Sequence, residues 1–187
     1  MIVEPRVIAV SADDLIAMRA EIVETHGAVF AEPPTSEGPA EITAFDASLD
    51  RLVRKPGFRA CTARDPNGAL AGFAFGWEGG PGDRWWDTAT SAVDAHVRRR
   101  WFGDCFELVE LAVLRGSRRR GVGGALHDGL LEQTERPHAV LSTHAQAAPA
   151  RAFYAAREWR VVLEPLRFPG HEAPFAIMAR DLPTRSR

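Results

Sequence analysis

The sequence predicts a single α/β domain, from its size and composition, from the order of its strand and helix patterns, and from a basic glycine-rich loop between a strand and a helix. The chain has 187 residues, and 45% of them are hydrophobic, which suits one domain with a core of ordinary size. The patterns run strand, two helices, three strands, helix, strand, helix, two strands. Without repeats or linkers, one domain over 1–187 is expected.

The first elements are a strand and two helices. Residues 6–10 read as a strand, and Ser11 is a suitable N-cap for a helix over 12–30, whose first turn is acidic. Residues 31–40 contain three prolines and a glycine and are therefore expected to form a loop. A second helix is expected over 42–54, because Pro-Gly follows it.

A hairpin and a less predictable segment follow. Strands over 58–63 and 70–77 are joined by Asp-Pro-Asn-Gly at 65–68, which is a strong turn signal. Residues 78–104 contain a glycine pair, one proline and a tryptophan pair, and within them a helix is expected over 88–100.

The second half alternates strands and helices. A strand over 105–114 precedes a helix over 121–135, in which three leucines share one face. A strand over 138–144 leads to a helix that Pro149 starts. The remaining elements are that helix over 150–158, strands over 159–165 and 175–181, and a tail, 183–187, that is expected to be disordered.

Composition and charge exclude several classes of protein. The formal net charge of −2 favours neither nucleic acid nor an anionic membrane, and no apolar run approaches the ~18 residues of a membrane span. The N-terminus lacks the features of a signal peptide, so a cytoplasmic protein is expected. All but one of the 23 basic residues are arginine, which favours a GC-rich bacterial genome. Cys61 and Cys105 have no metal spacing, so reduced core thiols and no metal are expected.

The most informative segment joins a strand to a helix through a basic loop. Glu-Leu-Val-Glu-Leu-Ala-Val occupies 107–113, and Arg-Arg-Arg-Gly-Val-Gly-Gly occupies 118–124 before an apolar helical run. Backbone N–H groups at a helix N-terminus, together with the helix dipole, favour an anion, most plausibly a diphosphate. An ordinary basic turn before an amphipathic helix is the alternative.

The glycine spacing distinguishes between known phosphate loops. The segment lacks the Lys-Ser/Thr of a P-loop and the Gly-x-Gly-x-x-Gly of a dinucleotide site. Its Arg-x-x-Gly-x-Gly, formed by Arg118, Gly121 and Gly123, resembles the acyl-CoA-binding motif of the GNAT (Gcn5-related) N-acetyltransferase superfamily. The resemblance covers about 6–182, but only 107–159 is specific.

The resemblance implies a GNAT fold and a donor site. The expected fold is a mixed, mostly antiparallel sheet of six to seven strands, flanked by helices, with a V-shaped splay between strands four and five. Leu111, Ala112 and Val113 would bind the pantetheine arm of acetyl-CoA or another acyl-CoA. The pyrophosphate would lie on the amides of Arg118, Arg119, Arg120, Gly121, Val122, Gly123 and Gly124. The side chains of Arg119 and Arg120 would either pair with phosphates or remain solvated.

The resemblance also implies catalytic candidates. Acyl transfer needs a neutral amine, a stabilised oxyanion and a protonated leaving thiolate. Tyr154 matches the family's usual acid, with a core tyrosine as the alternative. In several family members the polar active-site residues lie four and six positions before the valine that ends the strand. By this resemblance Glu107 is the preferred base, because alternation places Glu107 and Val109 on that face and Glu110 on the other. Glu110 is the second choice, and two solvated carboxylates or proton removal by a water chain are the alternatives.

The segment before Tyr154 departs from the family pattern. Ala147 occupies the position of a common asparagine that contacts the pantetheine arm, and Gln146 is a possible substitute. Because of this difference, a catalytically weak protein that senses acyl-CoA is the alternative function.

The expected acceptor is the amine of a small molecule, attacked directly in a ternary complex. Trp85 and Trp86 would form an aromatic wall, with Asp87 attracting an ammonium group, or else the tryptophans anchor the segment by burial. Acetylation of a protein N-terminus or lysine is a further alternative. For the assembly, a monomer and a homodimer both stay open.

Overall fold

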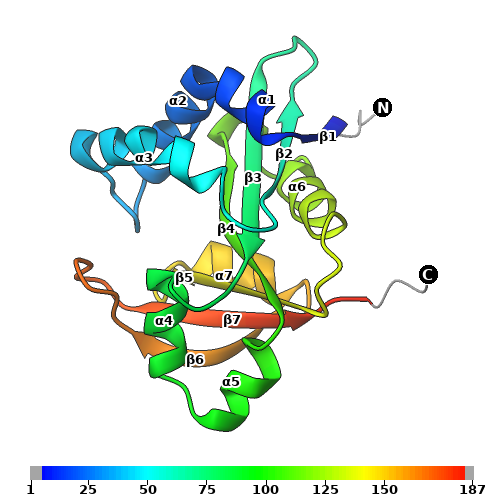
Figure 1. Cartoon of the computed structure of the whole chain (residues 1–187). Coiled ribbons are helices and arrows are strands. Elements are labelled where there is room, and N and C mark those ends of the chain that lie inside the picture. Colours follow the sequence, from blue (N-terminus) through cyan, green and yellow to red (C-terminus); the bar gives the residue numbers. More distant parts are fainter. Residues whose placement is uncertain (1–5, 184–187) are drawn as a thin grey trace. The chain divides into compact units, whose positions relative to one another are not determined.

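A computed structural model describes residues 6–183 of the chain (Figure 1). Its residues form two compact units, of which the first contains residues up to Trp77 and Val109–Thr134. The second contains Glu78–Leu108 and the residues from Glu135 onward. The last four residues of the expected disordered tail, 184–187, lie outside the described part.

Seven strands form a sheet of order β1-β2-β3-β4-β5-β7-β6, which confirms the predicted fold class. The strands are β1 (Arg6–Val10), β2 (Arg59–Arg64), β3 (Leu70–Glu78), β4 (Cys105–Val113), β5 (His138–His144), β6 (Arg160–Leu166) and β7 (Phe175–Asp181). The pairs β1–β2, β2–β3, β5–β7 and β6–β7 are antiparallel. Only Cys105–Glu107 of β4 pairs in parallel with β5, and beyond this point the two strands split as expected.

In the first unit, the predicted helix over 12–30 is two helices, α1 (Ala12–Ala17) and α2 (Arg19–Phe30). Ser11 caps α1 as predicted, in a reciprocal capping box with Asp14. The helix breaks at Met18, whose φ of −95° and ψ of 15° are not helical. Its sulfur accepts a hydrogen bond from Arg64 Nη2 at 3.2 Å, a long-range contact that helical periodicity cannot reveal.

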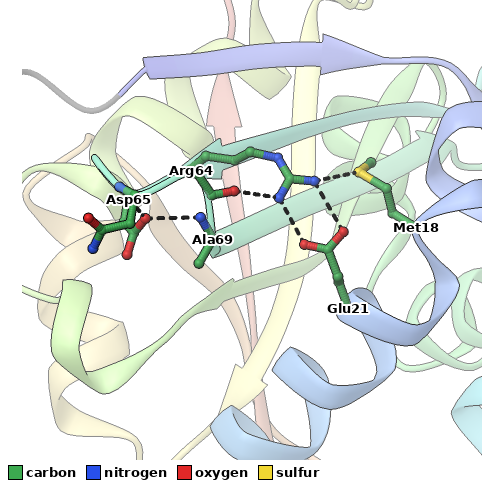
Figure 2. A network of polar contacts seen from close by, with 7 residues as sticks. Met18, Glu21, Arg64, Asp65 and Ala69 are labelled. Carbon is green, nitrogen blue, oxygen red and sulfur yellow. Dashed lines mark hydrogen bonds and ion pairs between the residues drawn. The ribbon is translucent and has the colours of Figure 1, made fainter.

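Arg64 fastens this helix break to the β2–β3 hairpin (Figure 2). Its Nη1 donates to Glu21 Oε2 and to the Gly68 carbonyl, both at 2.8 Å. In the turn itself, Asp65 Oδ1 accepts from the Ala69 N–H at 3.0 Å. One guanidinium therefore holds α2 and the end of the hairpin together.

Arg19 makes a similar double contact with α3 (Pro39–Leu52). Its Nη1 donates to Asp46 Oδ1 at 2.9 Å, and its Nη2 donates to Asp50 one turn later. The guanidinium thus joins the first turn of α2 to the outer side of α3.

The sheet of the first unit has helices on both faces. Phe73, Phe75 and Trp77 of β3 pack in one core cluster with α1–α3, whereas Gly72 faces α6 (Val122–Leu131). A Cβ on Gly72 would lie 2.5 Å from the Ala112 carbonyl oxygen and 3.0 Å from Leu126 of α6. Glycine at this position therefore permits β3, β4 and α6 to approach closely.

In the second unit, the single helix expected over 88–100 is two helices, α4 (Arg84–Ser91) and α5 (Ala95–Trp101). Each has its own aspartate N-cap, since Asp83 accepts from Trp85 N and Asp94 accepts from Val97 N. Both helices share a core cluster with β5 and β7. The last helix, α7 (Ala148–Ala155), follows β5. Between residues 6 and 183, no helix has both the length and the apolar character to cross a membrane.

Substituting Gly72 by alanine should destabilise the protein. The added methyl group would meet a backbone oxygen, which cannot rotate away, so we expect a loss of about 1–3 kcal/mol in the free energy of unfolding. Urea denaturation would measure it. Gly80→Ala is the control, because its Cβ would meet nothing within 4 Å, and its effect should stay within about 0.5 kcal/mol. Equal stability of the two variants would contradict the close packing at Gly72.

Candidate functional site

The predicted donor loop lies between β4 and α6 in the first unit. A short 3₁₀ turn, Arg115–Ser117, follows β4, and Gly121 then caps α6 with a φ of +82°. Glycine adopts this left-handed conformation without steric cost. No side chain caps this helix, so its first N–H groups have neither an intrahelical acceptor nor a capping side chain. The loop thus presents oriented N–H donors and the positive end of a helix dipole.

Arg118 holds this loop in place with its side chain. Its Nε donates to the Val113 carbonyl at 3.0 Å, and its Nη1 donates to Glu32 Oε2 at 2.6 Å. The guanidinium lowers the pKa of Glu32 through this hydrogen bond. The Arg118 N–H donates to the Arg115 carbonyl. The Arg118 side chain is therefore an internal tether of the loop, and the contact of its backbone amide with pyrophosphate stays a prediction.

The other loop residues differ in how far their side chains are exposed to solvent. Arg119 and Arg120 are exposed, and Arg119 has a positive φ of 59°. Val122 is buried, whereas Gly123 and Gly124 are half-buried in the first turn of α6. Arg119 and Arg120 are thus among the basic side chains that the loop presents to solvent.

The strand segment before the loop is mostly buried. Ala112 is fully buried and Val113 nearly so, while Leu111 is half-buried. Parallel pairing with β5 has ended at Glu107, so this segment lies beyond the part of β4 that pairs with β5. The Leu114 N–H, which follows it, donates to the Ala71 carbonyl of β3.

The two candidate bases lie in different surroundings. Glu107 is buried in the second unit with 3% of its surface exposed, whereas Glu110 in the first unit has a side chain 20% exposed. Val109 packs against the core cluster of α1–α3, and Glu110 approaches His26 of α2. Val109 and Glu110, which strict alternation would place on opposite faces unless a bulge intervenes, thus both approach elements of the α1–α3 layer.

Tyr154 lies in the second unit, on α7, and is 8% exposed. Its ring packs edge-on against Trp159, with centroids 5.7 Å apart, and against Phe153. Ala147 is buried at the start of this helix, and its neighbour Gln146 is exposed. The ring of Tyr154 is thus fixed by aromatic packing.

The predicted acceptor residues belong to α4. Trp85 Nε1 donates to Ser142 Oγ at 3.0 Å, and Trp86 Nε1 donates to the Phe102 carbonyl at 3.4 Å. Both indoles pack against the core cluster of the second unit, which matches the anchoring alternative. Asp87 is exposed and accepts from the Gly82 N–H.

The structure adds His26 and Glu37, which sequence reasoning missed. The ring of His26 lies between the carboxylates of Glu37 and Glu110, and only 4% of the side chain is exposed. A lone histidine within a helical pattern gives no signal, because its partners lie far away in the sequence.

Comparison with known proteins places this geometry in context. The sequence model of the acetyltransferase (GNAT) family matches residues 28–159 of this chain. That range includes β4, the loop, α6 and Tyr154. A GCN5-like protein acetyltransferase of Mycobacterium tuberculosis is 30% identical over an alignment of 131 residues, which covers 63% of this chain and 61% of that relative. The match thus spans less than two thirds of the relative's length.

Solved structures show the same fold. A GNAT-family acetyltransferase of Staphylococcus aureus is 13% identical with a TM-score of 0.62, over 95% of this chain and 100% of that one. A PaiA N-acetyltransferase of Thermoplasma acidophilum, solved with coenzyme A, is 14% identical with a TM-score of 0.59, over 96% and 100%. At these identities, the likeness concerns the fold.

The two cysteines should be unreactive in the folded protein. Both are buried free thiols, as predicted, and burial raises the pKa of Cys61 and of Cys105 to about 12. A disulfide reagent at mildly alkaline pH should label neither thiol in the native state and both after denaturation. Since ordinary thiols ionise near pH 9.0, these groups should also lower stability as pH rises from about 9 to 12. Rapid labelling of the native protein would contradict this burial.

Proposed function

Because this chain belongs to the acetyltransferase (GNAT) family, we propose that it transfers an acetyl group from acetyl-CoA to the amine of a small molecule. The transfer is direct, within a ternary complex. Both cysteines are buried with raised pKa values, which disfavours an acyl-cysteine route and is consistent with direct transfer.

The geometry of the β4–loop–α6 segment carries this proposal. Gly121 is left-handed at an uncapped helix N-terminus, so the N–H groups of the first turn of α6 are available to a diphosphate. Arg119 and Arg120 add positive charge, and Arg118 keeps the loop in shape. The residues present therefore fit the anionic part of coenzyme A.

The donor strand and the catalytic candidates have different roles in this transfer. When bound, acetyl-CoA supplies an acetyl group activated as a thioester. The backbone of Leu111–Val113 aligns the pantetheine arm, and the phenol of Tyr154 protonates the departing sulfur. Glu110 is the better candidate base, because its side chain reaches the surface, whereas Glu107 is buried.

A protein acceptor is the second candidate. The Mycobacterium tuberculosis relative is named as a protein acetyltransferase, which favours a lysine or N-terminal amine as the group acetylated. A sensor that binds acetyl-CoA without turnover is the third, since Ala147 replaces the amide side chain expected there. Thiol release from acetyl-CoA, measured against panels of small amines and peptides, separates the three.

Gly121→Asp should abolish coenzyme A binding. The aspartate would place a negative charge where the pyrophosphate binds, and we expect at least about a hundredfold weaker affinity by calorimetry. Gly68→Asp is the matched control, since Gly68 has a similar φ of +87° and open space for a side chain but lies in the β2–β3 turn. Unchanged affinity in Gly121→Asp, or equal losses in both variants, would remove the loop as the donor site.

Tyr154→Phe should lower turnover without weakening donor binding. The phenylalanine ring keeps the contacts with Phe153 and Trp159, so the fold and the dissociation constant of coenzyme A should be preserved. Losing a general acid should reduce kcat by about a hundredfold. Thiol-release kinetics and a thermal unfolding curve measure both properties. A variant as active as the wild type would exclude Tyr154 from the proton transfer.

A further inference from the structure

A cavity lies at the C-terminal end of α3, in the first unit. Its volume is about 530 Å³, which is within the range of small-molecule sites in proteins. The lining comes from one stretch of chain, the last turns of α3 and the turn that follows: Ala47, Asp50, Arg51, Arg54, Lys55 and Pro56. All of these residues except the half-buried Lys55 are exposed, so a ligand can enter from solvent. We call this space the α3 cavity.

Backbone hydrogen bonds bring the basic residues of the cavity together. Where α3 ends, the Arg54 N–H donates to the Arg51 carbonyl at 3.3 Å, and the Lys55 N–H donates to the Leu52 carbonyl at 3.1 Å. Bonds of this i→i−3 type tighten the last turn of a helix. Gly57, with a φ of +64°, then lets the chain leave in a new direction. Three cationic side chains therefore lie within little more than one turn of chain.

The two arginines of the cavity have no acceptor in the protein. Within residues 6–183, neither the Arg51 nor the Arg54 guanidinium forms a hydrogen bond or an ion pair. Arg19 of α2, by contrast, donates to Asp46 and Asp50. A guanidinium has five N–H donors in a planar fork that matches the oxygens of a phosphate. The α3 cavity thus contains donors for an anion that the fold itself does not supply.

The carboxylate in the lining does not neutralise these cations. Asp50 accepts a hydrogen bond from Arg19 Nη2, so its charge is already balanced by an arginine outside the cavity. Arg51, Arg54 and Lys55 therefore leave an excess of positive charge in the α3 cavity, although the whole chain has a formal net charge of −2. This local excess favours a ligand with more than one negative charge.

Lys55 connects the cavity to the core of the first unit. Its Nζ lies 5.6 Å from the centroid of the Trp77 ring, and this cation–π contact keeps the ammonium group near the indole. Trp77 is 5% exposed and belongs to the core cluster of α1–α3. A ligand that draws Lys55 toward it would change the surroundings of the Trp77 indole, which provides a local signal of binding.

The α3 cavity is separate from the proposed donor loop. Phe73 and Phe75 of β3 pack on the side of the sheet that α3 covers, whereas Gly72 faces α6. Coenzyme A bound at the N-terminus of α6 would therefore use other groups of the protein. Ala47 and Pro56 add apolar surface beside the cations of the α3 cavity, which suits an anion attached to a carbon skeleton.

We propose that the α3 cavity binds the phosphate group of a small phosphorylated molecule. Arg51 and Arg54 donate to the phosphate oxygens, and Lys55 supplies the third positive charge. Ala47 and Pro56 contact the carbon skeleton of the ligand. A phosphate dianion offers oxygens to both guanidinium forks at once, which gives it an advantage over a singly charged carboxylate. This binding requires no acetyl transfer, so it can be tested whether or not the proposed function holds.

Calorimetry with glucose 6-phosphate tests the site, in protein to which excess coenzyme A has been added to occupy the donor loop. We expect a dissociation constant of about 1 mM or lower. Arg51→Gln combined with Arg54→Gln should raise it at least about tenfold, because both forks are removed. Arg99→Gln combined with Arg160→Gln is the matched control, since it removes two exposed arginines from the second unit and changes the net charge equally. No binding to the wild type, or equal affinities of the two double variants, would overturn the site.

An NMR measurement locates the ligand in the unaltered protein. Glucose 6-phosphate should shift the indole N–H signal of Trp77, assigned with a Trp77→Phe variant, and glucose should not. Inorganic phosphate distinguishes the two sources of the anion. Equal affinities for both phosphates would identify free phosphate as a sufficient ligand, and tighter binding of the ester would show that its carbon skeleton contributes. A Trp77 signal that stays unchanged, or that responds equally to glucose, would refute the site.

Discussion

The close approach of β3 to β4 at Gly72 is the constraint on which the first unit depends. With no side chain there, β4 lies against β3 and beneath α6, and Ala112 and Val113 are buried at the contact. This position of β4 places the Val113 carbonyl where Arg118 binds it, and the loop then turns into α6. It also places Glu110, two residues before Ala112, beside His26. The proposed donor segment and the contact of Glu110 with His26 thus lie on one strand.

The sequence predicts those parts of the structure whose determinants are local. The strands over 6–10, 138–144 and 175–181 have the expected bounds, and Ser11 caps its helix as expected. Helix breaks are harder to predict. Residues 12–30 look helical throughout, but the helix breaks at Met18, whose sulfur accepts a hydrogen bond from Arg64 of β2. That contact is distant in the sequence. The second aspartate cap, Asp94, divides what composition alone presents as one helix.

The difference between local and long-range determinants also explains which parts of the site the sequence predicts. The donor motif is contiguous, so its spacing alone predicts the loop, and Gly121 is left-handed at the start of the helix that follows. His26, Glu37 and Glu110 come from α2, the following loop and β4, and no local pattern connects these segments. Side-chain roles are equally non-local. The motif marks Arg118 as a loop residue, but only its contact with Glu32 identifies it as a tether.

The arginine-rich composition has a consequence for how this protein can be altered. Arg19, Arg64 and Arg118 each bind two or more acceptors through different nitrogens of one planar guanidinium. A lysine has a single terminal nitrogen on a flexible stem and cannot reproduce this fork. Exchanging arginine for lysine, which conserves charge and leaves the isoelectric point nearly unchanged, would therefore disconnect segments that the guanidinium groups now join. At these positions, charge is a poor guide to which changes the fold tolerates.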